Sequence, residues 1–119
     1  MSWQSVRHPI HDEADGSHFY MRAEEWPFAG DKPVCFMVDV DYPPDFCPPV
    51  ILAKFLLTAS RDTQVVLAVQ KIDYDAENAI VERHDWSADP RNFAELVSPE
   101  AADAVYRYVF GGKGPSDQN

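Results

Sequence analysis

The sequence predicts an α+β domain in which an antiparallel sheet of about four to five strands carries one or two C-terminal helices packed on one face. Three observations support this fold class. Apolar residues alternate with other residues in several short segments before residue 87, which is typical of half-buried strands. Turn-forming residues separate these segments. Helical spacing of apolar residues begins only after residue 89.

The clearest predicted strand is 33–42, where every even position is apolar and the odd positions become acidic toward the end. Its even positions are Val34, Phe36, Val38, Val40 and Tyr42. Further strands are expected over 17–26, 64–72 and 79–86. Residues 1–16 show little periodicity and end in a polar turn at 12–16, so no strand is assigned to them.

The segment 50–59 is open to two interpretations. It follows a connector, 43–49, whose four prolines exclude a central strand or a helix interior there. The leucines and alanines of 50–59 suit a helix, which the preceding prolines could start. Apolar residues nevertheless alternate cleanly, and residues 60–63 make a credible hairpin loop into 64–72, so a strand is favoured.

Two helix start signals follow. Asp89-Pro90 predicts a short helix reaching residue 97, and Ser98-Pro99 predicts a second helix that ends at Phe110 before Gly111. The buried stripe expected on the second helix is Ala101, Val105, Tyr108 and Val109. The 119 residues have room for one core, so we expect a single domain over 1–112 and a flexible tail over 113–119.

Composition excludes several classes of protein. A net charge of −10 and an isoelectric point near 4.6 argue against binding to a nucleic-acid backbone. The longest nearly apolar run is 50–59; it is interrupted by Lys54 and too short to span a membrane. The first nine residues lack the apolar core of a secretory signal. The two cysteines, Cys35 and Cys47, make no disulfide framework, so we expect free, partly buried thiols in the cytoplasm.

The acidic residues are unevenly distributed along the chain. Segments 11–45 and 73–103 each carry a net charge of −7, and they flank segment 46–72, which carries +2. If the middle segment forms the centre of the sheet, acidic groups collect on its rims and turns. Such a surface either keeps the protein in solution or attracts a basic partner by charge.

Possible metal sites are weak in this sequence. Asp39, Asp41 and Asp45 offer oxygens for Mg²⁺ or Mn²⁺, but such spacing is common by chance in an Asp-rich chain. Residues 73–78 resemble half of a calcium loop and fail at its sixth and twelfth positions, so a turn is the better interpretation. The densest set of zinc-type ligands matches no standard spacing: His8, His11, Asp12, Glu13 and His18. We therefore predict no metal or other cofactor.

Signals for catalysis are also weak. Cys35 or Cys47 could pair with His84 or an N-terminal histidine, but a thiol inside a strand is usually inert. No phosphate-binding glycine loop, nucleophile elbow or zinc-protease motif is present. The sequence therefore predicts a protein that is not an enzyme.

Aromatic residues crowd the acidic N-terminal segment, and rigid apolar anchors with a charged rim are typical of protein interfaces. The leading hypothesis is a small acidic inhibitor, of the immunity-protein, antitoxin or phage-inhibitor type, that covers a basic surface of a toxin, nuclease or nucleic-acid-binding complex. The residues expected to contact this partner are Asp39, Asp41, Asp45, Asp73, Asp75, Glu77, Trp26, Tyr42 and Phe46. One alternative is an accessory subunit that adds a strand edge to a larger assembly; a metal or thiol enzyme is the other.

Overall fold

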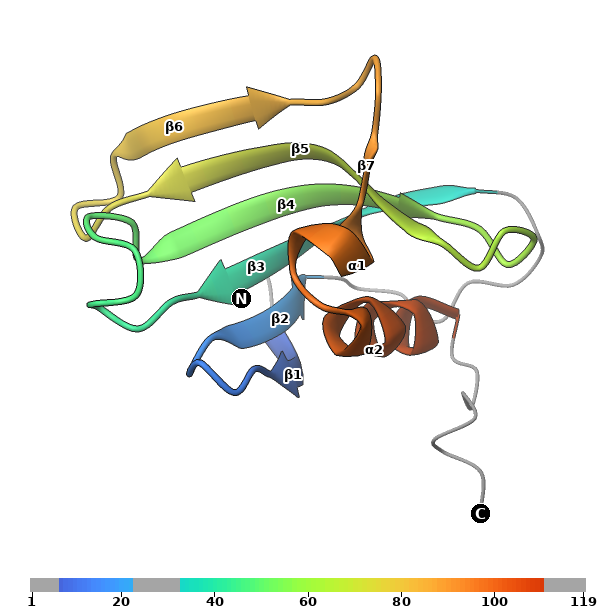
Figure 1. Ribbon diagram of the computed structural model, residues 1–119, viewed down its shortest axis with the longest axis horizontal. Coiled ribbons are helices and arrows are strands. Elements are labelled where there is room, and N and C mark those ends of the chain that lie inside the picture. The colour runs from blue at the N-terminus through green and yellow to red at the C-terminus, as the bar shows by residue number, and fades with distance from the viewer. Residues whose placement is uncertain (1–6, 23–32, 111–119) are drawn as a thin grey trace, which may run out of the picture.

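The computed structural model describes residues 7–22 and 33–110, in which an antiparallel sheet is followed by two helices (Figure 1). The α+β fold class is therefore confirmed. The strands are β1 (Arg7–Asp12), β2 (His18–Arg22), β3 (Val34–Asp41), β4 (Leu52–Ala59), β5 (Val66–Tyr74), β6 (Ile80–Asp85) and β7 (Arg91–Asn92). The helices are α1 (Phe93–Leu96) and α2 (Pro99–Phe110). Trp26 and the predicted tail lie outside the described residues.

The sheet has seven strands, more than the four to five predicted. Strands β1 to β6 lie side by side in chain order, each antiparallel to the next, and β7 pairs with β5. The prediction missed β1 because its sequence, Arg-His-Pro-Ile-His-Asp, has no apolar alternation. It missed β7 because Asp89-Pro90 resembles a helix start, whereas the chain first makes two residues of strand.

Strand β4 settles the ambiguity of segment 50–59. It pairs with β3 on one side and β5 on the other, so it is an interior strand of the sheet. Alternate residues are fully buried, beginning with Ala53 and Phe55, and the residues between them are half-buried. Partial burial on both faces explains why the segment is apolar throughout and why composition alone could not exclude a helix.

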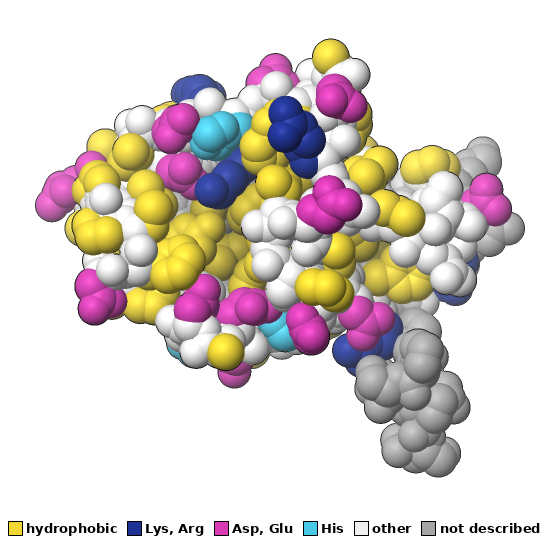
Figure 2. All heavy atoms as spheres, in the orientation of Figure 1, with side chains coloured by type: hydrophobic (Ala, Val, Ile, Leu, Met, Phe, Trp, Pro, Cys, Tyr) yellow, Lys and Arg dark blue, Asp and Glu magenta, His cyan; other side chains and the backbone are white. Residues whose placement is uncertain are grey.

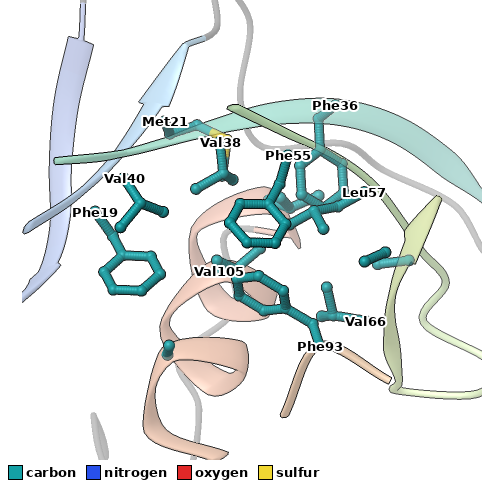
Figure 3. Packing of buried hydrophobic residues seen from close by; sticks show 14 of the residues in the cluster. Phe19, Met21, Phe36, Val38, Val40, Phe55, Leu57, Val66, Phe93 and Val105 are labelled. Carbon is teal, nitrogen blue, oxygen red and sulfur yellow. The ribbon is translucent and has the colours of Figure 1, made fainter. Parts of the chain in front are cut away.

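The helices cover one face of the sheet, and the core lies between the two layers (Figures 1 and 3). Phe93 of α1 is wholly buried, and its ring meets Phe55 of β4 edge-on at 5.2 Å and Phe19 of β2 edge-on at 6.3 Å. Val105 of α2 is also wholly buried beside them (Figure 3). Removing a side chain as large as Phe93 from water stabilises the fold by roughly 1.5–3 kcal/mol.

The caps explain where the helices begin. The side chain of Asn92 accepts a hydrogen bond from the backbone N–H of Ala94 at 2.9 Å, so α1 starts after Asn92 and not at Asp89 as predicted. The Ser98 hydroxyl accepts from the N–H of Ala101 at 3.0 Å, which confirms the predicted start of α2.

Three residues of the predicted α2 stripe, Ala101, Val105 and Val109, are buried, whereas Tyr108 is half-buried beside His8, with ring centroids 6.0 Å apart. Neither helix of the described part of the chain has the length and apolar character needed to cross a bilayer.

Candidate functional site

The order of the strands brings three acidic turns to one end of the sheet. In an antiparallel meander successive turns alternate between the two ends, so turns β1–β2, β3–β4 and β5–β6 share an end (Figure 1). We call residues 13–17, 42–51 and 75–79 the acidic turns. They carry five carboxylates and no lysine or arginine. These carboxylates belong to Glu13, Asp15, Asp45, Asp75 and Glu77.

The acidic turns differ in how far their carboxylates are used internally. Asp75 Oδ1 accepts hydrogen bonds from the N–H groups of Glu77 and Ala79, both at 2.9 Å, and thereby closes the β5–β6 turn. This local role explains the resemblance of residues 73–78 to a calcium loop. Asp45 and Glu77 are exposed and therefore present their carboxylates to solvent.

An exposed aromatic side chain lies on the acidic turn between β3 and β4. Phe46 is 48% exposed, and its ring stacks on that of Tyr42, with centroids 5.1 Å apart and planes 17° from parallel. The connector that holds Phe46 is ordered by two hydrogen bonds, from the Phe46 N–H to the Pro43 carbonyl at 3.0 Å and from the Val50 N–H to the Cys47 carbonyl at 2.8 Å. Four prolines further restrict its backbone. Phe46 is therefore presented by a stiff turn.

Tyr42 is the inner member of this aromatic stack. Burial, together with the negative charge of Asp73, raises the pKa of Tyr42 above its ordinary value. Its phenol consequently stays neutral further into the alkaline range than that of a free tyrosine, and its ring stacks on Phe46 as an uncharged platform.

Two of the predicted contact residues lie on the face of the sheet away from the helices. Asp39 and Asp41 share this face, and Arg7 lies 3.4 Å from Asp39 and 2.8 Å from Asp41. Partial burial of Arg7 by itself lowers the pKa of its guanidinium. The hydrogen bond and negative charge of Asp41, together with the charge of Asp39, outweigh this effect, so the pKa of Arg7 is raised. The Asp39 side chain is only 4% exposed. These carboxylates thus stabilise the sheet surface, and Asp39 is not presented to a partner.

Asp73 is buried on the opposite face, the one that carries the helices. A bulge in β5 places it there: Leu56 and Leu57 of β4 pair with Gln70 and Ala68, so Val69 is an extra residue. Beyond the bulge the alternation of β5 is shifted by one residue, which turns Asp73 and Lys71 toward the helix side. Lys71 Nζ lies 3.3 Å from Asp73 Oδ1.

Strand β6 brings two further polar groups to Asp73. Glu82 pairs with Asp73 across the strands and His84 pairs with Lys71, so all four side chains share one face. Glu82 was not predicted to be a site residue, and His84 was predicted only as a possible partner for a thiol. The available signal was the Glu-x-His spacing, which places both side chains on the same face of a strand.

The N-terminal histidines do not converge on one another. His11 contacts Glu13 at 2.7 Å, His18 contacts Asp12 at 2.8 Å, and His8 lies beside Tyr108. Among residues 7–22 and 33–110, three potential metal ligands come together only at Asp73, Glu82 and His84. Cys35 and Cys47 are free thiols as expected, but both are exposed, which corrects the expectation of partial burial.

Figure 2 shows the face that carries the helices, where hydrophobic side chains gather beside them and acidic side chains line the left and lower margins. Comparisons of this chain with protein-family models, with curated proteins and with solved structures give no match.

Proposed function

We propose that this protein binds a basic protein through the acidic turns and thereby blocks that partner's cationic surface. The observation that carries the proposal is that three acidic turns without a single lysine or arginine share one end of the sheet, and that one of them exposes the ring of Phe46. In this role the protein is an inhibitor of the immunity-protein or antitoxin type that acts by binding and has no catalytic step.

Charge and the aromatic anchor contribute to different stages of binding. Carboxylates clustered at one end of the sheet speed the encounter with a cationic surface by roughly 10- to 1000-fold at low salt. The ring of Phe46 then slows dissociation, because a large apolar side chain that becomes buried at the centre of an interface contributes most of the binding energy. The stiff connector reduces the entropy that this turn loses on binding.

The proposed contact set is narrower than the sequence hypothesis. It keeps Asp45, Asp75, Glu77, Tyr42 and Phe46. It leaves out Asp39 and Asp73, because both carboxylates are buried, and Asp41, because Arg7 already engages it.

A cytoplasmic location forms part of the proposal. Cys35 and Cys47 are both exposed and unpaired with each other, and exposed thiols persist best in a reducing compartment.

Capture from cell extract tests the function. The immobilised protein is exposed to an extract of its source cells, and the retained proteins are identified by mass spectrometry. The variant Asp45→Asn/Glu77→Gln removes two exposed carboxylates of the acidic turns. The matched control Asp62→Asn/Asp89→Asn removes two exposed carboxylates located elsewhere, so both variants have the same net charge.

The proposal predicts a basic protein that wild type and the control retain and that Asp45→Asn/Glu77→Gln loses. Phe46→Ala should weaken binding of that protein by roughly 30-fold, which corresponds to about 2 kcal/mol. Equal capture by wild type and both double variants would contradict the proposal, because the acidic turns would then contribute nothing specific.

A second candidate function rests on the edge of the sheet. Strand β6 has a paired strand only on its β5 side within the described residues, and Ile80 and Val81 are 45% and 41% exposed. Such an edge could add to a sheet of a larger assembly. Light scattering tests self-assembly of this kind: a stable oligomer that Val81→Lys dissociates would support it, and a monomer at all concentrations would exclude it.

A further inference from the structure

Strands β5 and β6 carry a cluster of ligand-type side chains that the proposed function does not use. The donor atoms of Asp73, Glu82 and His84 all lie within 4.8 Å of one another. His84 Nε2 is 3.9 Å from Asp73 Oδ2 and 3.6 Å from Glu82 Oε2. The three groups come from adjacent strands of one sheet, so backbone pairing fixes their relative positions.

The burial of Asp73 is the feature that most needs explanation. Its side chain is only 8% exposed, and its Oδ1 accepts no hydrogen bond. The ammonium of Lys71 lies 3.3 Å from Oδ1 without forming one, and His84 is too far from Oδ2 for a hydrogen bond. A buried carboxylate is normally hydrogen-bonded, paired or bound to a metal ion. Asp73 therefore has the Lys71 ammonium as an ion-pair partner but no hydrogen bond at Oδ1, so the cost of burying its charge is only partly compensated.

The two donor separations that involve His84 are close to those of a zinc site, and the third, between Asp73 and Glu82, is no more than 4.8 Å. Ligand atoms about 2.1 Å from a tetrahedral ion lie about 3.4 Å from one another. The separations of 3.6 and 3.9 Å around His84 exceed this value by only a few tenths of an ångström, which small side-chain rotations can close. Imidazole with two carboxylates suits Zn²⁺ better than Mg²⁺ or Ca²⁺, which prefer oxygen ligands alone.

The surroundings hold these ligands and leave a route for an ion. Trp86 stacks on the His84 ring, with centroids 5.4 Å apart and planes 22° from parallel, and so restricts its rotation. The side chains of Glu82 and His84 are 61% and 32% exposed, so an ion can reach the cluster from solvent. Lys71 opposes a cation by charge, but its ammonium approaches Asp73 at Oδ1, whereas His84 approaches Oδ2.

From this geometry we propose that Asp73, Glu82 and His84 form a binding site for one Zn²⁺ ion. Three protein ligands leave a fourth position of the tetrahedron open to water or to an anionic group of another molecule. The site is separate from the acidic turns and does not depend on their proposed function.

Calorimetric titration of the untagged full-length protein with Zn²⁺ tests the site. Wild type should bind one ion with a dissociation constant of roughly 10 µM or tighter. His84→Gln and Asp73→Asn should each weaken binding at least 10- to 100-fold, the loss that even an outer-shell change causes. Lys71→Met should tighten binding several-fold, because it removes a like charge from beside the ion.

Matched controls separate this cluster from other ligands of the chain. Glu77→Gln removes an exposed carboxylate from the same hairpin, and His18→Gln removes a histidine that contacts Asp12. Both should leave the affinity for Zn²⁺ unchanged. Because Asp73 is buried, circular dichroism must show that Asp73→Asn is folded. His84 is partly exposed, so if Asp73→Asn unfolds, the zinc affinity of His84→Gln alone tests the proposed site.

Addition of Zn²⁺ should also raise the unfolding temperature of wild type and leave that of His84→Gln unchanged, because a ligand that binds only the folded state stabilises it. Three results would overturn the proposal: wild type binds no Zn²⁺, His84→Gln binds it as tightly as wild type, or His18→Gln is the variant that loses it. The last result would place the ion on the β1–β2 hairpin.

Discussion

Replacement of Phe93 by alanine tests how α1 is held against the sheet. Phe93 is wholly buried and its ring makes edge-on contacts with Phe19 and Phe55. Truncation of a buried Phe to Ala costs about 3–5 kcal/mol, which includes roughly 0.5–1.5 kcal/mol for each aromatic pair lost. A domain of 119 residues has a total stability of about 6–18 kcal/mol. The change should therefore remove a large fraction of the free energy of unfolding.

Urea denaturation followed by circular dichroism measures this loss, and two controls interpret it. Phe93→Leu keeps most of the volume and should cost less than about 1.5 kcal/mol. Leu96→Ala alters the same helix at a residue that is 40% exposed, and it should cost about 0.5 kcal/mol. If Phe93→Ala loses less than about 1 kcal/mol, Phe93 does not fill the core and the packing of α1 described above is wrong.

Three further predictions follow from single contacts. Ser98→Ala should lower the free energy of unfolding, measured by urea denaturation, by about 1–2 kcal/mol. The Ser98 hydroxyl both caps α2 and donates a hydrogen bond to Glu13 at 2.5 Å, and an unchanged free energy of unfolding would exclude the cap. Above pH 10 the free energy of unfolding of wild type should fall as the pH rises. Tyr42→Phe should make this slope shallower by up to about 1.4 kcal/mol per pH unit, measured by urea titrations. The unfolded tyrosine ionises near 10.0 while the buried one keeps its proton, so stability present below that pH is lost as the pH rises; parallel curves for the two proteins would refute this. Phe46→Ala should change the free energy of unfolding of the isolated protein, measured by thermal denaturation, by no more than about 0.5 kcal/mol. A larger loss of stability would show that Phe46 has a structural role.

Elements with strong periodicity could be predicted from the sequence. Strand β3 and helix α2 each show an uninterrupted apolar face, and β4 alternates clearly enough to favour a strand. Strand β1 could not be predicted in this way. It is held by backbone pairing with β2 and by contacts such as Arg7 with Asp41, and neither leaves an apolar pattern in the sequence.

The composition of the candidate site was only partly predictable. Counting charges along the chain found the acidic segments, but it could not assign each carboxylate to a face of the sheet. One bulged residue, Val69, decides that Asp73 is turned toward the helix side, where β6 supplies Glu82 and His84. The convergence of the acidic turns depends on the full order of the strands, including β1, and so appears only in the structure.

The most direct test of the proposed function is the association rate constant with the captured partner, measured over a range of salt concentrations. Between about 10 mM and 1 M salt the screening length falls from about 30 to 3 Å, so attraction by the acidic turns should fade. We predict that association with wild type and with Asp62→Asn/Asp89→Asn slows steeply with salt, while Asp45→Asn/Glu77→Gln is already slow at low salt. Equal slowing of the two double variants at low salt would show that net charge alone, and not the acidic turns, attracts the partner.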